Sequence, residues 1–213
     1  MQTVLNTINL KEATMRLTQL TLTGLCMVLT VSIAMAKDKK PEKQMDMQAM
    51  METYSKLAAP GEPHKKFASL AGSWTTKTKA WMEPNKPPME STGSCEHKML
   101  LDGRFLQQEC TGDMMGQQFT GIGMNGYDNH TKKYVSTWMD SMGTGIYFME
   151  GTASADGKTI TQKGQYDDPI EGHMKLRGVT KIVDSNSEIF EMYGTDKSGK
   201  ERKMMEITYT RKP

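Results

Sequence analysis

Residues 95–110 read CEHKMLLDGRFLQQEC, two strand-like runs separated by the turn pair Asp102-Gly103. An Asp-Gly pair between such runs is typical of a β-hairpin with a two-residue type I′ loop. In that geometry Cys95 and Cys110 face each other directly, at a separation that a disulfide bond tolerates. The segment therefore predicts two paired antiparallel strands, and we expect the two cysteines to form a disulfide.

The same hairpin has an alternative interpretation as a soft-metal site. Cys95, His97 and Met99 alternate onto one face, and Cys110 lies opposite Cys95. Thiolate, imidazole and thioether groups together suit a metal such as Cu(I). A disulfide and core packing explain the same residues, so we predict no metal ligand. Metal or redox handling, with a contribution from the 21 methionines of the chain, is kept as an alternative function.

The strand pattern continues from Gly72 to the end of the chain. Segments rich in β-branched and aromatic residues are interrupted by nine turn signals. These are Pro84 to Pro88, Asp102-Gly103, Met115-Gly116, Asp128-Asn129, Ser141-Met142-Gly143, Asp156-Gly157, Asp167-Asp168-Pro169, Asp184-Ser185-Asn186 and Ser198-Gly199. Nine short breaks predict an all-β fold, a closed antiparallel up-and-down barrel of about ten strands.

Alternation predicts the inner face of two of these strands. In the strand around residues 170–182 the inward set is Met174, Leu176, Gly178, Thr180 and Ile182, which leaves His173 outside. In the last strand the inward set is Met205, Ile207 and Tyr209, with Glu206 on the opposite face. The strand at residues 117–127 does not reveal its inner face.

The first 36 residues have the composition of a signal peptide. Arg16 precedes an uncharged apolar run from Leu17 to Ile33, and Ala34-Met35-Ala36 provides small residues for cleavage after Ala36. The run is short for a membrane span, which needs about 20 residues. We therefore expect a protein exported to the bacterial periplasm or exterior, without a membrane span after cleavage. Translation can start at Met1 or Met15.

Removal of 36 residues from the 213 leaves 177, the size of one domain. We expect a linker and one amphipathic helix over residues 37–63, in which Met47, Met50, Met51 and Tyr54 recur at helical spacing. Pro60-Gly61-Glu62-Pro63 ends this helix, and a short helical turn around residues 65–70 leads into a barrel domain over residues 64–213. The 27 basic and 25 acidic residues are interspersed, which argues against a nucleic-acid partner.

Gly72-Ser73-Trp74 at the start of the first strand resembles the Gly-x-Trp motif that opens lipocalin and other calycin barrels. In those barrels an arginine of the last strand packs over the tryptophan, which implies a stack of Trp74 and Arg211. A wider resemblance covers most of residues 64–212, including Gly103-Arg104-Phe105-Leu106 and Trp138-Met139-Asp140-Ser141-Met142-Gly143-Thr144. It is to an uncharacterised, exported bacterial family that is described as a domain of unknown function and grouped with the calycins. The resemblance implies the fold and supplies no catalytic residue.

The leading hypothesis for the function is an exported binding protein that takes a small apolar or amphipathic molecule into the barrel lumen. An internal cavity of roughly a few hundred Å³ would support it. We predict that the mouth is lined by some of the aromatic residues Trp81, Phe105, Tyr127, Tyr134, Trp138 and Phe148.

An enzyme acting on a small molecule is the alternative from another class. It would need a carboxylate inside the barrel with a raised pKa, such as Asp140 or Glu206 as general base. The sequence contains no nucleophile elbow, phosphate loop or metal-protease motif, so we predict no catalytic residue and no particular cofactor.

Overall fold

The computed structural model describes residues 46–83, 85–114, 116–195 and 198–213, and the expected signal peptide lies outside them. The chain divides into two units between Met51 and Glu52. Helix α2 (Met47–Ala58) contains this division, so the predicted amphipathic segment is helical and ends before Pro60. Helix α3 (Glu62–Ser69) begins three residues earlier than the predicted turn. Pro63 permits this because the first turn of a helix does not use its N–H groups.

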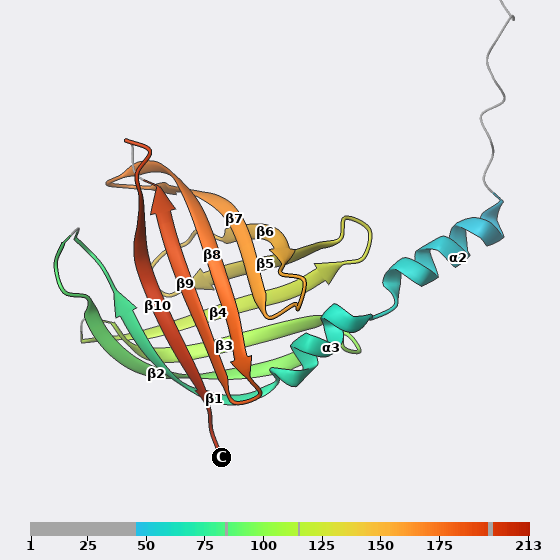
Figure 1. The fold of residues 1–213 in the computed structure, drawn as a ribbon, viewed down its shortest axis with the longest axis horizontal. Coiled ribbons are helices and arrows are strands. Elements are labelled where there is room, and N and C mark those ends of the chain that lie inside the picture. Colours follow the sequence, from blue (N-terminus) through green and yellow to red (C-terminus); the bar gives the residue numbers. More distant parts are fainter. Residues whose placement is uncertain (1–45, 84, 115, 196–197) are drawn as a thin grey trace, which may run out of the picture. The chain divides into compact units, whose positions relative to one another are not determined.

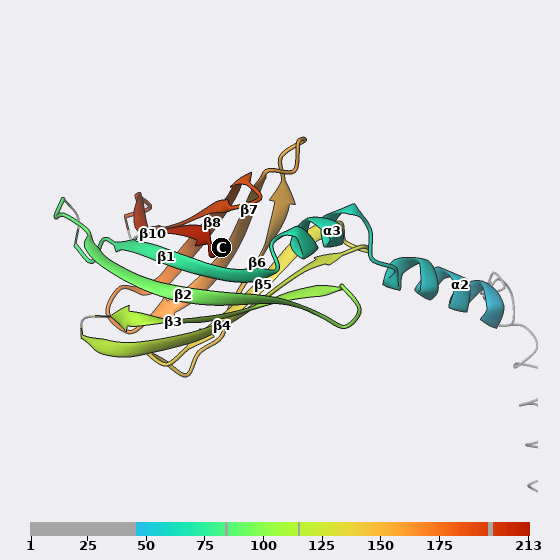
Figure 2. The ribbon, with the colours of Figure 1, turned by 90° about the horizontal axis from the view of Figure 1, so that it is seen from below.

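The second unit contains a closed barrel in which every strand pairs antiparallel with its neighbours in the sequence, and β1 pairs with β10 (Figures 1 and 2). This confirms the predicted up-and-down barrel. Its ten strands are β1 (Gly72–Ala80), β2 (Met89–Leu100), β3 (Phe105–Met114), β4 (Gln117–Asp128), β5 (Lys133–Asp140), β6 (Tyr147–Ala153), β7 (Thr159–Asp168), β8 (Gly172–Asp184), β9 (Ser187–Thr195) and β10 (Glu201–Arg211).

The predicted turns locate the connections of the barrel. Each connection between successive strands contains all or part of one predicted turn. In the hairpin of β2 and β3 the register is as predicted, with Cys95 opposite Cys110. The loop is wider than the predicted two-residue turn, because residues 101–104 lie outside the strands and Leu101 also has a positive φ of 49°. A four-residue loop with the same centre leaves the pairing unchanged.

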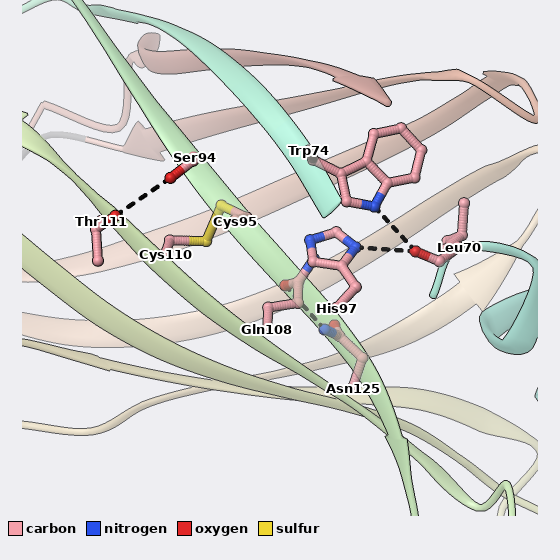
Figure 3. The surroundings of a disulfide bond; sticks show 9 residues. All are labelled: Leu70, Trp74, Ser94, Cys95, His97, Gln108, Cys110, Thr111 and Asn125. Carbon is pink, nitrogen blue, oxygen red and sulfur yellow. Dashed lines mark hydrogen bonds between the residues drawn. A yellow bond between two sulfur atoms is a disulfide. The ribbon is translucent and has the colours of Figure 1, made fainter. Parts of the chain in front are cut away.

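Cys95 and Cys110 form a disulfide between β2 and β3 (Figure 3). Their Cα atoms are 4.1 Å apart, and the two residues are 2% and 7% exposed. Both sulfur atoms are bonded to each other, so neither is a free thiolate. The soft-metal alternative therefore loses two of its four donor groups.

We expect this disulfide to resist reduction while the protein is folded. A reductant must reach one sulfur along the S–S axis, and both cysteines face the interior of the barrel with little exposed surface, so in the folded state it approaches only through that interior. Alkylation of the peptides that contain Cys95 and Cys110, after exposure to dithiothreitol, should be at least about tenfold slower in buffer than in urea. Equal rates would show that the sulfurs are accessible in the folded state.

Helix α3 closes the end of the barrel at which β1 begins (Figure 1). Phe67 and Leu70 are 6% and 3% exposed and belong to the same hydrophobic cluster as Trp74 at the start of β1. The Trp74 indole N–H donates a hydrogen bond of 3.0 Å to the Leu70 carbonyl oxygen. The helix is therefore part of the core.

Arg211 joins the last strand to the end of this helix. Its guanidinium donates hydrogen bonds of 2.7 Å to the carbonyl oxygens of Ser69 and Ala71, and its Cζ lies 4.3 Å from the centre of the Trp74 ring. Carbonyl groups at a helix C-terminus lack partners within the helix. The arginine supplies such a partner to Ser69, the last residue of α3, and covers the tryptophan face with the same group, a cation–π arrangement.

Candidate ligand-binding site

A cavity of about 350 Å³ lies inside the barrel. Phe67 and Leu70 close it beneath α3, and it reaches the opposite end of the barrel at Asp113, which is exposed to solvent. The cavity therefore has a closed end under the helix and an open end, its mouth. In the described part of the chain, its lining comes from all ten strands and combines apolar side chains with hydroxyl and amide groups.

Three aspartates stand at the mouth. Asp113, Asp140 and Asp168 lie at or next to the last residues of β3, β5 and β7, which run in the same direction away from α3, and all three line the cavity. Asp140 accepts a hydrogen bond of 2.8 Å from the Trp138 indole N–H. Backbone N–H groups of the turn after β7 donate to Asp168 and lower the pKa of its carboxyl.

Aromatic pairs form much of the wall near the mouth. The rings of Tyr147 and Tyr166 lie 4.6 Å apart, and Phe119 stacks on Trp138 at 6.3 Å. The Trp138 ring lies across β4 at Gly121, where a Cβ atom would come within 2.3 Å of it. A glycine is required at this close approach, which explains why the inner face of β4 gives no apolar signal in the sequence.

Of the six aromatic residues that were predicted to line the mouth, the structure places two in the cavity lining and four elsewhere. Tyr134 and Trp138 line the cavity. Tyr127 packs on Tyr134 at 5.0 Å and on His64 of α3 at 6.0 Å, so it belongs to the closed end. Like Tyr127, three further residues lie outside the cavity lining: Trp81 just after β1, Phe105 on β3 and the half-exposed Phe148 on β6.

In place of Phe105 and Phe148, a neighbour of each in the sequence faces the inside of the barrel. Leu106 follows Phe105 and is 1% exposed, and Tyr147 precedes Phe148 and lines the cavity. The choice of aromatic residues did not identify the inner face of these strands, because side chains alternate between the two faces of a strand. The inward sets predicted for β8 and β10 are correct for Met174, Leu176 and Thr180 and for Met205, Ile207 and Tyr209.

Glu188 is the buried carboxyl group of the lumen, and it is not among the residues predicted from the sequence. It lies on β9 opposite Tyr209 of β10, near the closed end, and is 4% exposed. Its Oε2 atom has no hydrogen-bond partner among the described residues. Burial raises the pKa of the carboxyl from its ordinary value of 4.5 to about 7. A two-residue turn centred on Ser198-Gly199, treated like the turn at Asp102-Gly103, would have placed Glu188 opposite the inward-facing Tyr209.

Neither acid proposed for the enzyme alternative is a buried carboxyl. Asp140 sits at the open end, where it accepts hydrogen bonds from Trp138 and from the backbone of Met142. Glu206 lies outside the cavity lining and accepts a hydrogen bond of 2.7 Å from Lys203. The carboxyl that lies inside the barrel with a raised pKa is Glu188 instead.

His97 forms part of a polar chain beside the disulfide (Figure 3). Burial lowers its pKa to about 4, so the ring is neutral at pH 7. Its Nδ1 lies 3.2 Å from the Leu70 carbonyl oxygen and therefore donates, which leaves Nε2 to accept from the Gln108 amide at 3.1 Å. Asn125 in turn donates to Gln108 Oε1. These hydrogen bonds satisfy both ring nitrogens of a histidine in the core. The described residues contain no group of three acidic, histidine or cysteine side chains placed to hold a metal.

Comparisons with known proteins bear on the family and the fold. The profile of a family described as "Protein of unknown function (DUF1579)" matches residues 59–211. Rv2717c from M. tuberculosis, a crystal structure, is 12% identical with a TM-score of 0.53, over 73% of this chain and 100% of that one. The S-type phycobiliprotein lyase CPES from Guillardia theta is 11% identical with a TM-score of 0.50, over 71% and 93%. Likenesses at such identities concern the fold alone. No curated protein matches the chain.

Proposed function

The chain belongs to the DUF1579 family, and we propose that it binds a small amphipathic molecule in the lumen of its barrel. The observation that carries this proposal is the cavity of about 350 Å³, open at one end. Small-molecule sites commonly occupy roughly 300–1,000 Å³ and are mostly apolar with a few polar groups. A barrel of purely structural role would fill this space with side chains.

The lining supports an amphipathic ligand over a purely apolar one. Its apolar part includes Leu106, Ile160 and Phe190, and its polar part includes Gln162 and Asn125. Apolar surface favours the body of a ligand by removing it from water, whereas fixed amide and hydroxyl groups orient a polar end.

We also propose that the protein acts outside the cytoplasm, in the periplasm or the cell exterior. Disulfides persist in oxidising compartments, and the bond between Cys95 and Cys110 supports such a location. The signal peptide expected over residues 1–36 would deliver the chain there. Among the described residues, none of the helices has the length and apolar character needed to cross a bilayer.

A side chain that fills the lumen should block binding. Thr180 lines the cavity on β8, between Ile160 and Phe190 on the neighbouring strands. We expect Thr180→Phe to raise the Kd for the neutral fluorescent probe N-phenyl-1-naphthylamine at least about tenfold, because the phenyl group occupies the space that the probe needs. Fluorescence titration of the wild type and the variant measures this.

Thr208→Phe is the matched control for that experiment. Thr208 lies on β10 between the inward residues Ile207 and Tyr209, and it is absent from the cavity lining. The same substitution there should leave the Kd within about twofold of the wild type, since the added ring faces outward. Equal losses in both variants, or no binding by the wild type, would contradict lumen binding.

A further inference from the structure

We propose that the lumen selects a cationic ligand, an amine attached to an apolar body, and that Glu188 is the counter-ion of the amine at the closed end. The inference rests on the proposed function, since it names the class of molecule that the same cavity takes. It is carried by the acidic side chains of the lining, by a buried carboxyl of which one oxygen lacks a described partner, and by the aromatic walls.

The side chains of the cavity lining that can carry a charge near neutral pH are all acidic among the described residues. Among the described lining residues the carboxyl side chains are Asp113, Asp140, Asp168 and Glu188, and there is no lysine, arginine or histidine. The chain as a whole has nearly equal numbers of basic and acidic residues, 27 and 25, so this separation is a property of the lumen. Carboxylates in a cavity with low-dielectric walls concentrate a negative potential, which attracts cations and repels anions.

One carboxyl oxygen of Glu188, Oε2, lacks a hydrogen-bond partner among the described residues. Its neighbours across the sheet are Tyr209 on β10 and Ile182 on β8, and Oε2 makes no hydrogen bond with any described residue. A buried carboxyl oxygen without a donor is destabilising unless something supplies one. An ammonium group supplies both N–H donors and a compensating charge, and a charge-assisted hydrogen bond is roughly twice as strong as a neutral one.

The aromatic walls suit the same ligand class. Tyr209 lies directly opposite Glu188, and Tyr134, Phe67 and Phe190 also line the cavity. The faces of aromatic rings attract a cation within about 6 Å, most strongly where water is excluded. Rings beside a carboxylate therefore favour an organic cation, whose apolar body the remaining rings and methionines of the lumen accommodate.

A metal ion does not fit these carboxylates as well as an elongated organic cation. Glu188 lies near the closed end and the three aspartates at the mouth, so they face opposite ends of the cavity. No three of the described acidic, histidine or cysteine side chains are placed to share a metal. A ligand with a fatty-acid head group would bring a fifth carboxylate into the lumen, and the repulsion disfavours it.

Three ligands with the same chain and different head groups test the inference. We would titrate the purified protein with decylamine, decanol and decanoate at pH 7.5 and measure displacement of N-phenyl-1-naphthylamine. We expect decylamine to bind at least about tenfold more tightly than either of the others, because only its head group pairs with Glu188. Equal affinity of decanol, or tighter binding of decanoate, would overturn the inference and leave the proposed function intact. Failure of the probe and of all three ligands to bind would overturn both.

Two substitutions of glutamate on β9 assign the effect to one residue. Glu188→Gln should reduce the preference for decylamine over decanol to less than about threefold, because the amide keeps the shape and removes the charge. Glu191→Gln is the matched control: Glu191 lies on the same strand outside the cavity lining, and its partners are Lys181 and Lys203. It should keep the full preference. A preference that survives in Glu188→Gln would show that Glu188 is not the counter-ion.

Discussion

Trp74→Ala should lower the stability of the folded protein by about 4 kcal/mol, within the range for large aromatic residues removed from a core. Trp74 is 0% exposed and donates a hydrogen bond of 3.0 Å to the Leu70 carbonyl oxygen. The Arg211 guanidinium covers its ring at 4.3 Å. Removal of the indole leaves a cavity under α3, and the Arg211 guanidinium loses the aromatic ring on which it packs. In a chain of this size, thermal unfolding should shift down by roughly 8–16 °C.

Trp81→Ala is the control for this prediction, because it makes the same chemical change at the other end of β1. Trp81 is partly exposed, and its ring lies 5.7 Å from the Lys203 ammonium nitrogen on β10. We expect a loss of about 1 kcal/mol, typical of a residue with little buried surface to lose. Urea denaturation of both variants gives the two values. Similar losses would show that Trp74 is not central to closure of the barrel by the helix.

The fold could be predicted because its determinants are local. Each turn carries residues such as Asp-Gly or Asp-Pro that favour a reversal, so the number and order of the strands follow from the spacing of the turns. The centre of one turn then fixes which residues face each other, and the disulfide between Cys95 and Cys110 followed from it. Small differences in loop width, as at Leu101, do not move that centre.

The lumen could not be predicted to the same extent, because its walls depend on which face of each strand turns inward. On β4 the inner positions include Gly121 and Gly123, whose lack of side chains makes room for Trp138, while Ile122 between them is 41% exposed. On β9 each face carries one glutamate and apolar residues, so alternation does not distinguish Glu188 from Glu191. Only the cross-strand register separates the buried acid from the ion-paired one.

Glu188→Gln should also change how stability depends on pH. Burial raises the pKa of Glu188 from 4.5 to about 7, so between these values the folded protein holds a proton that the unfolded chain has released. The wild type therefore loses stability as the pH rises through this interval, by roughly 3 kcal/mol in total. The glutamine variant does not titrate at this position. Relative to the wild type, we expect it to gain roughly 3 kcal/mol between pH 4.5 and pH 8, seen as a relative rise of roughly 6–12 °C in Tm.

The other titratable groups around Glu188 do not obscure the stability difference between the variant and the wild type. Tyr209 faces it from β10, and both burial and the charge of Glu188 raise the pKa of that phenol, so it stays neutral over the interval. His97 packs against Tyr209 at 5.8 Å; burial lowers its pKa to about 4, and its contribution is common to both proteins.

Glu191→Gln is the control that shows whether the changed pH dependence comes from the burial of Glu188 or from the loss of any glutamate on β9. Although burial acts in the opposite direction, hydrogen bonds from Lys181 and Lys203 lower the pKa of Glu191 to about 2. Its contribution to stability is therefore present above the unfolded value of 4.5 and disappears only as the pH falls toward 2. The stability difference between this variant and the wild type should be constant from pH 4.5 to pH 8. A parallel pH dependence in the two variants would mean that Glu188 is not the buried acid that the lumen holds protonated. A relative gain in Glu188→Gln beside a constant difference in Glu191→Gln would identify Glu188 as the group that a bound cation would ionise.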